Sequence, residues 1–173
     1  NLYYQTGKHV SGVKISALNF LLEAAYENFV LGYEHLSGTD YSETEKFRSF
    51  TPFYGTNHKF NGFMDYFYVG NHINSVGLQD AYLNYSSPAN KIRWNATIHY
   101  FSSAGEINAE SGRYLGTELD LSVSWKVQDA ASISAGWSTM FAGENMELLK
   151  GGDHTAGHHW AYLMLSVTPT FIQ

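Results

Sequence analysis

The stretch YLGTELDLSVSWKV, residues 114–127, alternates apolar and polar side chains without a break. Successive side chains of a β-strand point to opposite faces, so this pattern predicts a strand with one apolar and one polar face. Glu118 and Asp120 fall on the polar face. The apolar face comprises Leu115, Thr117, Leu119, Leu121, Val123, Trp125 and Val127. The run exceeds the usual strand length of about five or six residues, and a long strand that is apolar on one side is typical of a bilayer-spanning barrel.

The composition favours an all-β fold. The 173 residues include 16 Gly, 13 Tyr and 11 Phe but 3 Pro, and 44% are hydrophobic, enough for one domain with a sizeable core. The formal charge of −6 without a basic run argues against a nucleic-acid partner. The absence of cysteine excludes disulfides and thiol chemistry.

The apolar segments are too short or too interrupted for a membrane helix. The most apolar of them, residues 17–26, contains Asn19 and Glu23. The first residues also lack the basic start and apolar centre of a signal peptide. We therefore expect any membrane crossing to use strands, and the chain to be mature, processed or cut from a longer one.

Turn signals and alternation together predict seven full strands and a fragment. They lie at 1–5, 12–24, 28–36, 77–86, 91–103, 114–127, 131–142 and 159–171. Short connections at 24–28, 86–90 and 127–131 alternate with long ones at 37–76, 104–113 and 143–158. Outer-membrane barrels show this asymmetry, with tight periplasmic turns and long extracellular loops. The prediction is one antiparallel transmembrane β-barrel segment, residues 1–173, in contact with the lipid bilayer of a Gram-negative outer membrane.

The polar faces of the predicted strands define the expected pore lining, which comprises Asp80, Lys91, Arg93, Glu118, Asp120 and Lys126. In a lumen, Glu118 and Asp120 would stay hydrated and pair with Lys91 or Arg93 of the neighbouring strand. Trp125 and Tyr114 lie near opposite strand ends, where interfacial aromatic girdles occur. The segment 12–24 mixes polar and apolar residues on both faces and would need a bulge near Ala17.

Three segments carry the resemblance to a known family. LGYEHLSGTD (31–40), TPFYGTNHKFNGFMDYFYVGN (51–71) and GLQDAYLNYSSP (77–88) resemble the alginate-export family of bacterial outer-membrane barrels, especially its Bacteroidetes-like members. The resemblance implies a large barrel that passes an anionic polysaccharide or small solutes, guided by inward basic side chains. Lys91 and Arg93 suit that role. A non-conducting barrel serving as an adhesin or scaffold, and a soluble carbohydrate-binding β-sandwich, are the alternatives.

The number of strands predicts that these residues are only part of the barrel. Side chains fill an eight-stranded barrel, whereas about 16 or more strands enclose an aqueous channel. The first predicted strand, before the turn signal at Thr6-Gly7, is also shorter than a membrane strand. We therefore expect the C-terminal half of a 16–18-stranded barrel, seen as an open sheet whose edges at 1–5 and 159–171 do not pair.

Two groups of residues have features of a catalytic or a metal-binding site. A carboxylate pair such as Glu118 and Asp120 suits glycoside hydrolysis, but no cleft-forming pattern accompanies it, so neither a catalytic residue nor a cofactor is expected. His154 and His158, with neighbouring Asp153 and His159, have the spacing of metal ligands on a helix. The glycines at 151, 152 and 157 favour a polar loop instead, so no metal is expected there.

Two parts of the long loop 37–76 also have candidate roles. Asp40, Glu43 and Glu45 suit calcium but lack the spacing of a calcium-binding hand, which favours a solvated loop. The segment 61–70 is expected either to fold inward as a constriction or to pack its aromatics against the rim.

Overall fold

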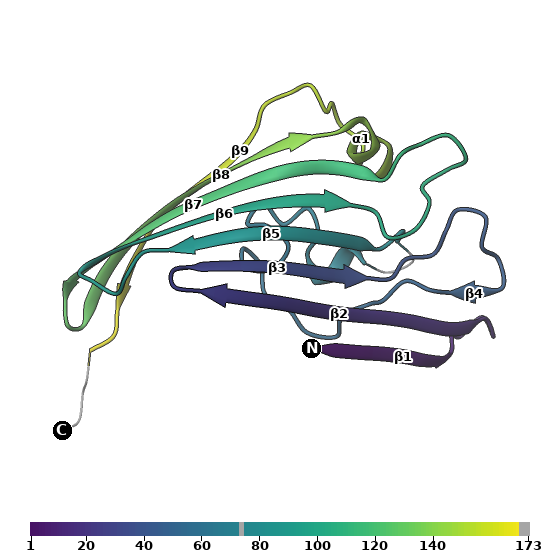
Figure 1. Cartoon of the computed structure of the whole chain (residues 1–173), viewed down its shortest axis with the longest axis horizontal. Coiled ribbons are helices and arrows are strands. Elements are labelled where there is room, and N and C mark those ends of the chain that lie inside the picture. Colours follow the sequence, from purple (N-terminus) through teal and green to yellow (C-terminus); the bar gives the residue numbers. More distant parts are fainter. Residues whose placement is uncertain (73–74, 170–173) are drawn as a thin grey trace.

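The computed structural model describes residues 1–72 and 75–169, which form one curved antiparallel sheet (Figure 1). Its eight long strands are β1 (Leu2–Lys8), β2 (Lys14–Tyr26), β3 (Phe29–Leu36), β5 (Leu78–Ser86), β6 (Ile92–Ser102), β7 (Tyr114–Gln128), β8 (Ala131–Ala142) and β9 (His158–Val167). A two-residue strand, β4 (Lys46–Phe47), pairs in parallel with β2. The helical elements are the 3₁₀ turn η1 (Val69–Asn71) and α1 (Glu144–Lys150). No helix among the described residues is long and apolar enough to cross a membrane.

The sheet is open. Its strands follow the order β1-β2-β3-β5-β6-β7-β8-β9, and within the described residues no ladder joins β1 to β9. The predicted all-β class, antiparallel pairing and unpaired edges are therefore confirmed. The long connections gather at one end of the sheet, which we call the loop end, where the tight β1–β2 turn also lies; the other tight turns lie at the opposite end, the turn end (Figure 1).

The N-terminal strands differ from their prediction. β1 continues through Thr6-Gly7 to Lys8, and the turn follows at 9–13, where the Val13 carbonyl accepts a hydrogen bond from the His9 amide. β2 pairs with β1 and β3 without a register shift, so the predicted bulge near Ala17 is wrong. Ala17 and Asn19 share a buried face because that face packs against a folded-in loop, where apolar and polar partners are both available. At the other edge, residues 170–171 of the predicted last strand lie outside the described residues.

A β-bulge reverses one side chain of the 114–127 stretch. Phe101 pairs with Gly116 while Ser102 pairs with Tyr114, so Leu115 is the extra residue of β7. The bulge turns the Leu115 side chain, which is 0% exposed, into the core rather than onto the predicted apolar outer face. Tyr114 in turn lies beside Tyr100, with ring centroids 5.0 Å apart.

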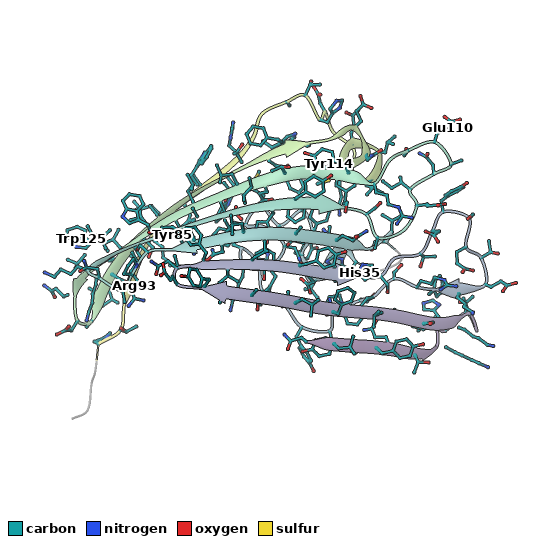
Figure 2. The ribbon with its side chains drawn as sticks, viewed as in Figure 1. His35, Tyr85, Arg93, Glu110, Tyr114 and Trp125 are labelled. Atoms are coloured by element: carbon teal, nitrogen blue, oxygen red, sulfur yellow. The ribbon has the colours of Figure 1, made fainter. Side chains whose placement is uncertain are left out.

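The two faces of the sheet have different surroundings. The outer face is bare and apolar; its exposed side chains include Leu22, Leu31, Leu83, Trp94, Ile98, Leu121, Trp125, Leu163 and Leu165. Figure 2 shows Trp125 at the turn end of β7 and Tyr114 at its loop end. Glu118, Asp120, Ser138 and Met140 are buried on the opposite, inner face, which confirms the predicted faces of 114–127 and 131–142 at these positions. At the turn end, a second register shift makes Val127 an extra residue of β7.

The hydrophobic core lies on the inner face, at the loop end. Residues 48–72 fold back behind the sheet in Figure 1, and their aromatic side chains Phe50 and Phe67 pack against inward side chains of the strands and of α1. The cluster comprises Ala17, Leu36, Phe50, Phe67, Leu78, Phe101, Leu115, Met140 and Met146. The loop thus supplies a second layer to a sheet that would otherwise have none.

Leu115→Ala tests the bulge. Removing this fully buried side chain leaves a cavity and should lower the free energy of unfolding by about 2–5 kcal/mol. Leu121→Ala, on the exposed outer face of the same strand, is the matched control and should lower it by less than half as much. Denaturant unfolding of both variants measures the difference, and equal losses would contradict the inward position of Leu115.

Candidate functional site: an acidic cluster that holds the inward loop

Four carboxylates and one histidine gather on the inner face of the central strands. They are Glu34 of β3, Asp80 of β5, His99 of β6, and Glu118 and Asp120 of β7. Strand register brings them together, because Glu34 lies opposite Asp80 and His99 lies opposite Glu118. Asp80 is 1% exposed, and Glu118 and Asp120 are 0% exposed. Buried carboxylates need hydrogen-bond donors, so the donors around them decide what the cluster does.

His99 bridges two of these carboxylates. Its Nδ1–H donates to Asp80 Oδ1 at 2.9 Å, and its Nε2 lies 3.6 Å from Asp120 Oδ2. Among the described residues it is the only basic side chain within ion-pair distance of the cluster. The carboxylates therefore depend on neutral donors for most of their hydrogen bonds.

Those donors come from the inward loop. The Met64 amide donates to Glu118 Oε1 at 2.8 Å, and the Phe63 amide donates to Asp120 Oδ2 at 3.2 Å. The Asn61 side-chain amide donates to Glu34 at 2.9 Å and to Asp80 at 3.2 Å. These hydrogen bonds satisfy buried acceptors, so the cluster fixes residues 61–64 against the sheet.

The loop's own backbone is shaped for this contact. Asn61 and Gly62 both have left-handed φ values, 54° and 87°, which turn their peptide groups toward the carboxylates. A Cβ at position 62 would lie 2.6 Å from the Glu118 carboxyl carbon, so glycine is required there by contact as well as by conformation. The same side of the loop reaches β9, where the His58 ring stacks on Trp160 with centroids 4.2 Å apart.

The predicted pore-lining residues separate into two groups. Asp80, Glu118 and Asp120 lie on the inner face as predicted, but they are sealed beneath the loop instead of hydrated. The predicted pairing of Glu118 and Asp120 with Lys91 or Arg93 is wrong. Arg93 lies opposite Ser124, four residues along β7 from Asp120, and Lys91 precedes β6. Lys126 instead pairs with Asp129 at the turn end, 2.8 Å away.

Residues 61–70 fold onto the inner face of the sheet, as their contacts with β7 show, and their role as a constriction stays a prediction. The segment consists of turns and the 3₁₀ element η1. His99 belongs to the polar face of the predicted strand 91–103, but the sequence did not mark His99 or Glu34 as members of a cluster, because the register between strands decides which polar residues meet. The left-handed Asn61-Gly62 pair is the one local feature that marks the contact point.

The histidine-rich segment does not gather its histidines. His154 Nδ1 pairs with Glu147 of α1 at 2.6 Å, and this contact raises the pKa of His154 and lowers the pKa of Glu147. Asp153 lies close enough for the three side chains to share an ion. His158 instead contacts Tyr66 at 3.1 Å, and His159 stacks on Trp137. The ion pair accounts for the proximity of Glu147 and His154 without a metal.

The acidic residues of the 37–47 loop have structural partners. Glu43 accepts backbone hydrogen bonds from Glu45 and Lys46 and pairs with Arg48 at 2.9 Å. Asp40 accepts the Glu106 amide at 2.7 Å, which ties this loop to the next one. These contacts organise the loop end.

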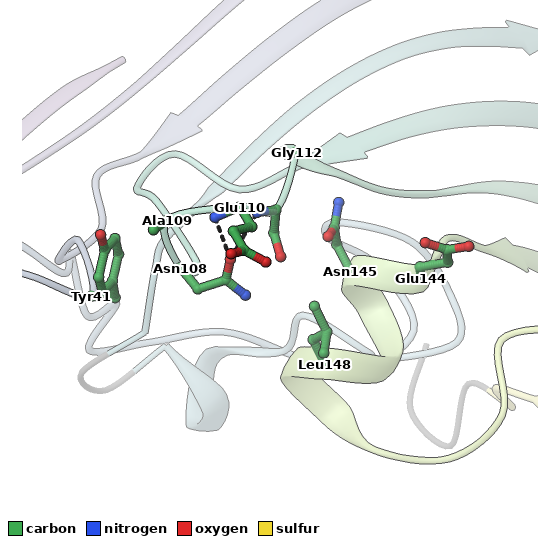
Figure 3. Close-up of a pocket in the computed structure, with 9 residues that line it drawn as sticks. Tyr41, Asn108, Ala109, Glu110, Gly112, Glu144, Asn145 and Leu148 are labelled. Atoms are coloured by element: carbon green, nitrogen blue, oxygen red, sulfur yellow. Dashed lines mark hydrogen bonds between the residues drawn. The ribbon is translucent and has the colours of Figure 1, made fainter.

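Two hollows lie outside the acidic cluster. One, at the loop end, lies between Tyr41, the 108–112 loop and α1; in it the Asn108 side chain accepts the Glu110 amide (Figure 3). The other, at the turn end, is lined by Arg93, Asn95, Ser122 and Ser124. In this second hollow, the positively charged side chain is that of Arg93, which lies at a polar, solvent-accessible part of the inner face.

No protein-family model, curated protein or solved structure gives a significant match to the chain.

Gly62→Ala tests the contact between the loop and Glu118. Alanine at a left-handed position is strained by about 1–2 kcal/mol, and here its Cβ would also displace a buried, hydrogen-bonded carboxylate. Gly12→Ala is the matched control, because Gly12 has nearly the same φ, 86°, with no atom within 4 Å of the added Cβ. We expect a larger loss of stability for Gly62→Ala, with faster proteolysis within residues 57–66. Equal stability and proteolysis in the two variants would contradict the contact.

Proposed function

We propose that the chain forms part of an outer-membrane β-barrel channel for solutes or an anionic polysaccharide, with residues 48–72 lying in the lumen. The observation that carries this proposal is the contrast between the two faces of the sheet. One is bare and apolar across its strands, and the other is polar and holds an inward loop. Lipid is the solvent that suits the first face, and a lumen suits the second.

Strand length supports a bilayer location. β7 has 15 residues and β2 has 13, and 15 residues extend about 50 Å at a rise of about 3.3 Å per residue. A tilted strand needs only about 9–11 residues to cross the hydrocarbon core. The aromatic side chains at the two ends of β7, Tyr114 and Trp125, then lie at opposite interfaces.

The open edges support a larger barrel. Strands β1 and β9 each have a free side in the described sheet, and unpaired backbone groups are not tolerated in lipid. We infer that further strands complete the ring, so that this sheet is the C-terminal half of a 16–18-stranded barrel, as the alginate-export resemblance implies. A ring of that size has room for both the inward loop and a channel.

The charge distribution suits an anionic solute better than the net charge of −6 suggests. The carboxylates Asp80, Glu118 and Asp120 are covered by the loop and face no open path. Arg93 lies in the polar turn-end hollow, and Lys91 is exposed nearby. A solute entering from the turn end would therefore meet these cations before the acidic cluster.

A non-conducting barrel that serves as an adhesin or scaffold is the second candidate. The observation that favours it is the dense packing of the inner face at the loop end, where Leu78, Phe101 and Leu115 are fully buried. Ion conductance through planar bilayers that contain the protein separates the two candidates, since only the channel gives discrete current steps.

Leu121→Arg tests whether the outer face contacts lipid. An arginine near the bilayer midplane should destabilise the inserted protein by ~2–4 kcal/mol, whereas Ser122→Arg, on the inner face of the same strand, should have little effect. The measurement is denaturant unfolding from liposomes. Equal sensitivity at both positions would refute the membrane assignment.

Replacing both Lys91 and Arg93 by glutamine tests the channel's selectivity. We expect a lower anion-to-cation permeability ratio, with an effect that weakens as salt shortens the Debye length to ~8 Å at about 0.15 M. Glutamine at Lys126, whose charge is already paired with Asp129, is the control and should change the ratio less. Reversal potentials in a salt gradient give the ratio, and an unchanged value at low salt would remove both residues from the channel lining.

A further inference from the structure

The two carboxylates of β7 each leave one oxygen unused. Glu118 Oε1 accepts the Met64 amide and Asp120 Oδ2 accepts the Phe63 amide, as described above. Glu118 Oε2 and Asp120 Oδ1 are also buried, but among the described residues neither has a hydrogen-bond partner. Two carboxylates buried side by side cannot both stay ionised without a compensating positive charge, so this pair must either share a proton or bind a cation.

A third buried oxygen lies beside them. Ser138 of β8 is paired with Asp120 in the ladder, which places its side chain next to that carboxylate on the inner face. Its hydroxyl is buried and has no partner among the described residues. Ser138 is 0% exposed, so its hydroxyl has neither a partner in the described part of the chain nor contact with bulk water. The three unsatisfied oxygens therefore belong to neighbouring ladder positions on the same face of two paired strands.

The charges around this place are not balanced. Glu34, Asp80, Glu118 and Asp120 contribute four carboxylates, and His99 is the one basic side chain that contacts them in the described part of the chain. Within the part of the chain that the structure describes, no lysine or arginine side chain forms an ion pair with the cluster. A bound cation would supply the missing charge and satisfy the orphaned oxygens together.

We propose that Glu118 Oε2, Asp120 Oδ1 and Ser138 Oγ bind a calcium ion beneath the inward loop. All three ligands are oxygens, which suits a hard cation rather than zinc or copper. Calcium accepts irregular sets of carboxylate, hydroxyl and water oxygens, whereas magnesium requires near-ideal octahedral geometry. Because the same two carboxylates hold Phe63 and Met64 through their other oxygens, the ion would tie the loop to β7 and β8. This site stands on these contacts alone and does not depend on channel activity.

The test uses the full chain in detergent micelles, freed of metal with a chelator. We expect calcium to bind in isothermal titration and to raise Tm by about 3–6 °C at ten times its Kd. Glu118→Gln combined with Asp120→Asn should abolish both effects while keeping an acceptor oxygen for each loop amide. Ser138→Ala, which removes no contact to the loop, should weaken binding by about tenfold.

Glu147→Gln is the control for the exposed cluster of Glu147, Asp153 and His154. It should leave the calcium Kd and the Tm shift unchanged. The proposal is overturned if the wild-type chain shows no calcium binding up to about 10 mM, a concentration that saturates even weak extracellular calcium sites. It is equally overturned if binding survives the double substitution, or if Glu147→Gln removes it.

Discussion

The structure depends on the hydrogen bonds between buried carboxylates of β7 and the backbone of the inward loop. A carboxylate that is fully withdrawn from water is stable only with charge-assisted partners. The sheet presents Glu118 and Asp120 on its inner face, and the loop presents the Phe63 and Met64 amides at the matching positions. Each side would be unsatisfied without the other. The loop also carries Phe50 and Phe67 into the hydrophobic core, so the hydrogen bonds to the carboxylates help to position these two aromatic side chains.

Much of the sheet could be predicted from the sequence because the side-chain period of a strand is a local property. The alternation of 114–127 located β7 and assigned Glu118, Asp120 and Leu121 to their faces. Leu115 departed from that assignment because a bulge is set by the pairing of Phe101 and Ser102 with β7, which local alternation does not encode. Ala17 departed for a related reason, since its face is defined by the loop that covers it.

The candidate site was harder to predict, because its geometry depends on register between strands. Periodicity gives the face on which a residue lies, but not its height along the strand relative to a neighbour. Arg93 and Glu118 share a face, yet the register places Arg93 opposite Ser124 and His99 opposite Glu118. The long 103–113 connection carries no turn signature that fixes this register in advance. The carboxylates therefore contact His99 and the backbone amides of Phe63 and Met64 instead of the predicted lysine and arginine.

The position of the core has a consequence for how this fold is stabilised. A closed barrel satisfies its strands by pairing around the ring, and a soluble sheet buries one face against a second layer. Here the second layer consists of residues 48–72 together with α1, and it covers only the loop end of the inner face. Toward the turn end the same face carries Arg93, Asn95, Ser122 and Ser124 around an open hollow. The inner face thus changes along the strands from a packed interior to a polar surface. The packed part of the inner face ends where Glu118 and Asp120 bind the loop. These two residues therefore determine how far along the strands the loop covers the inner face.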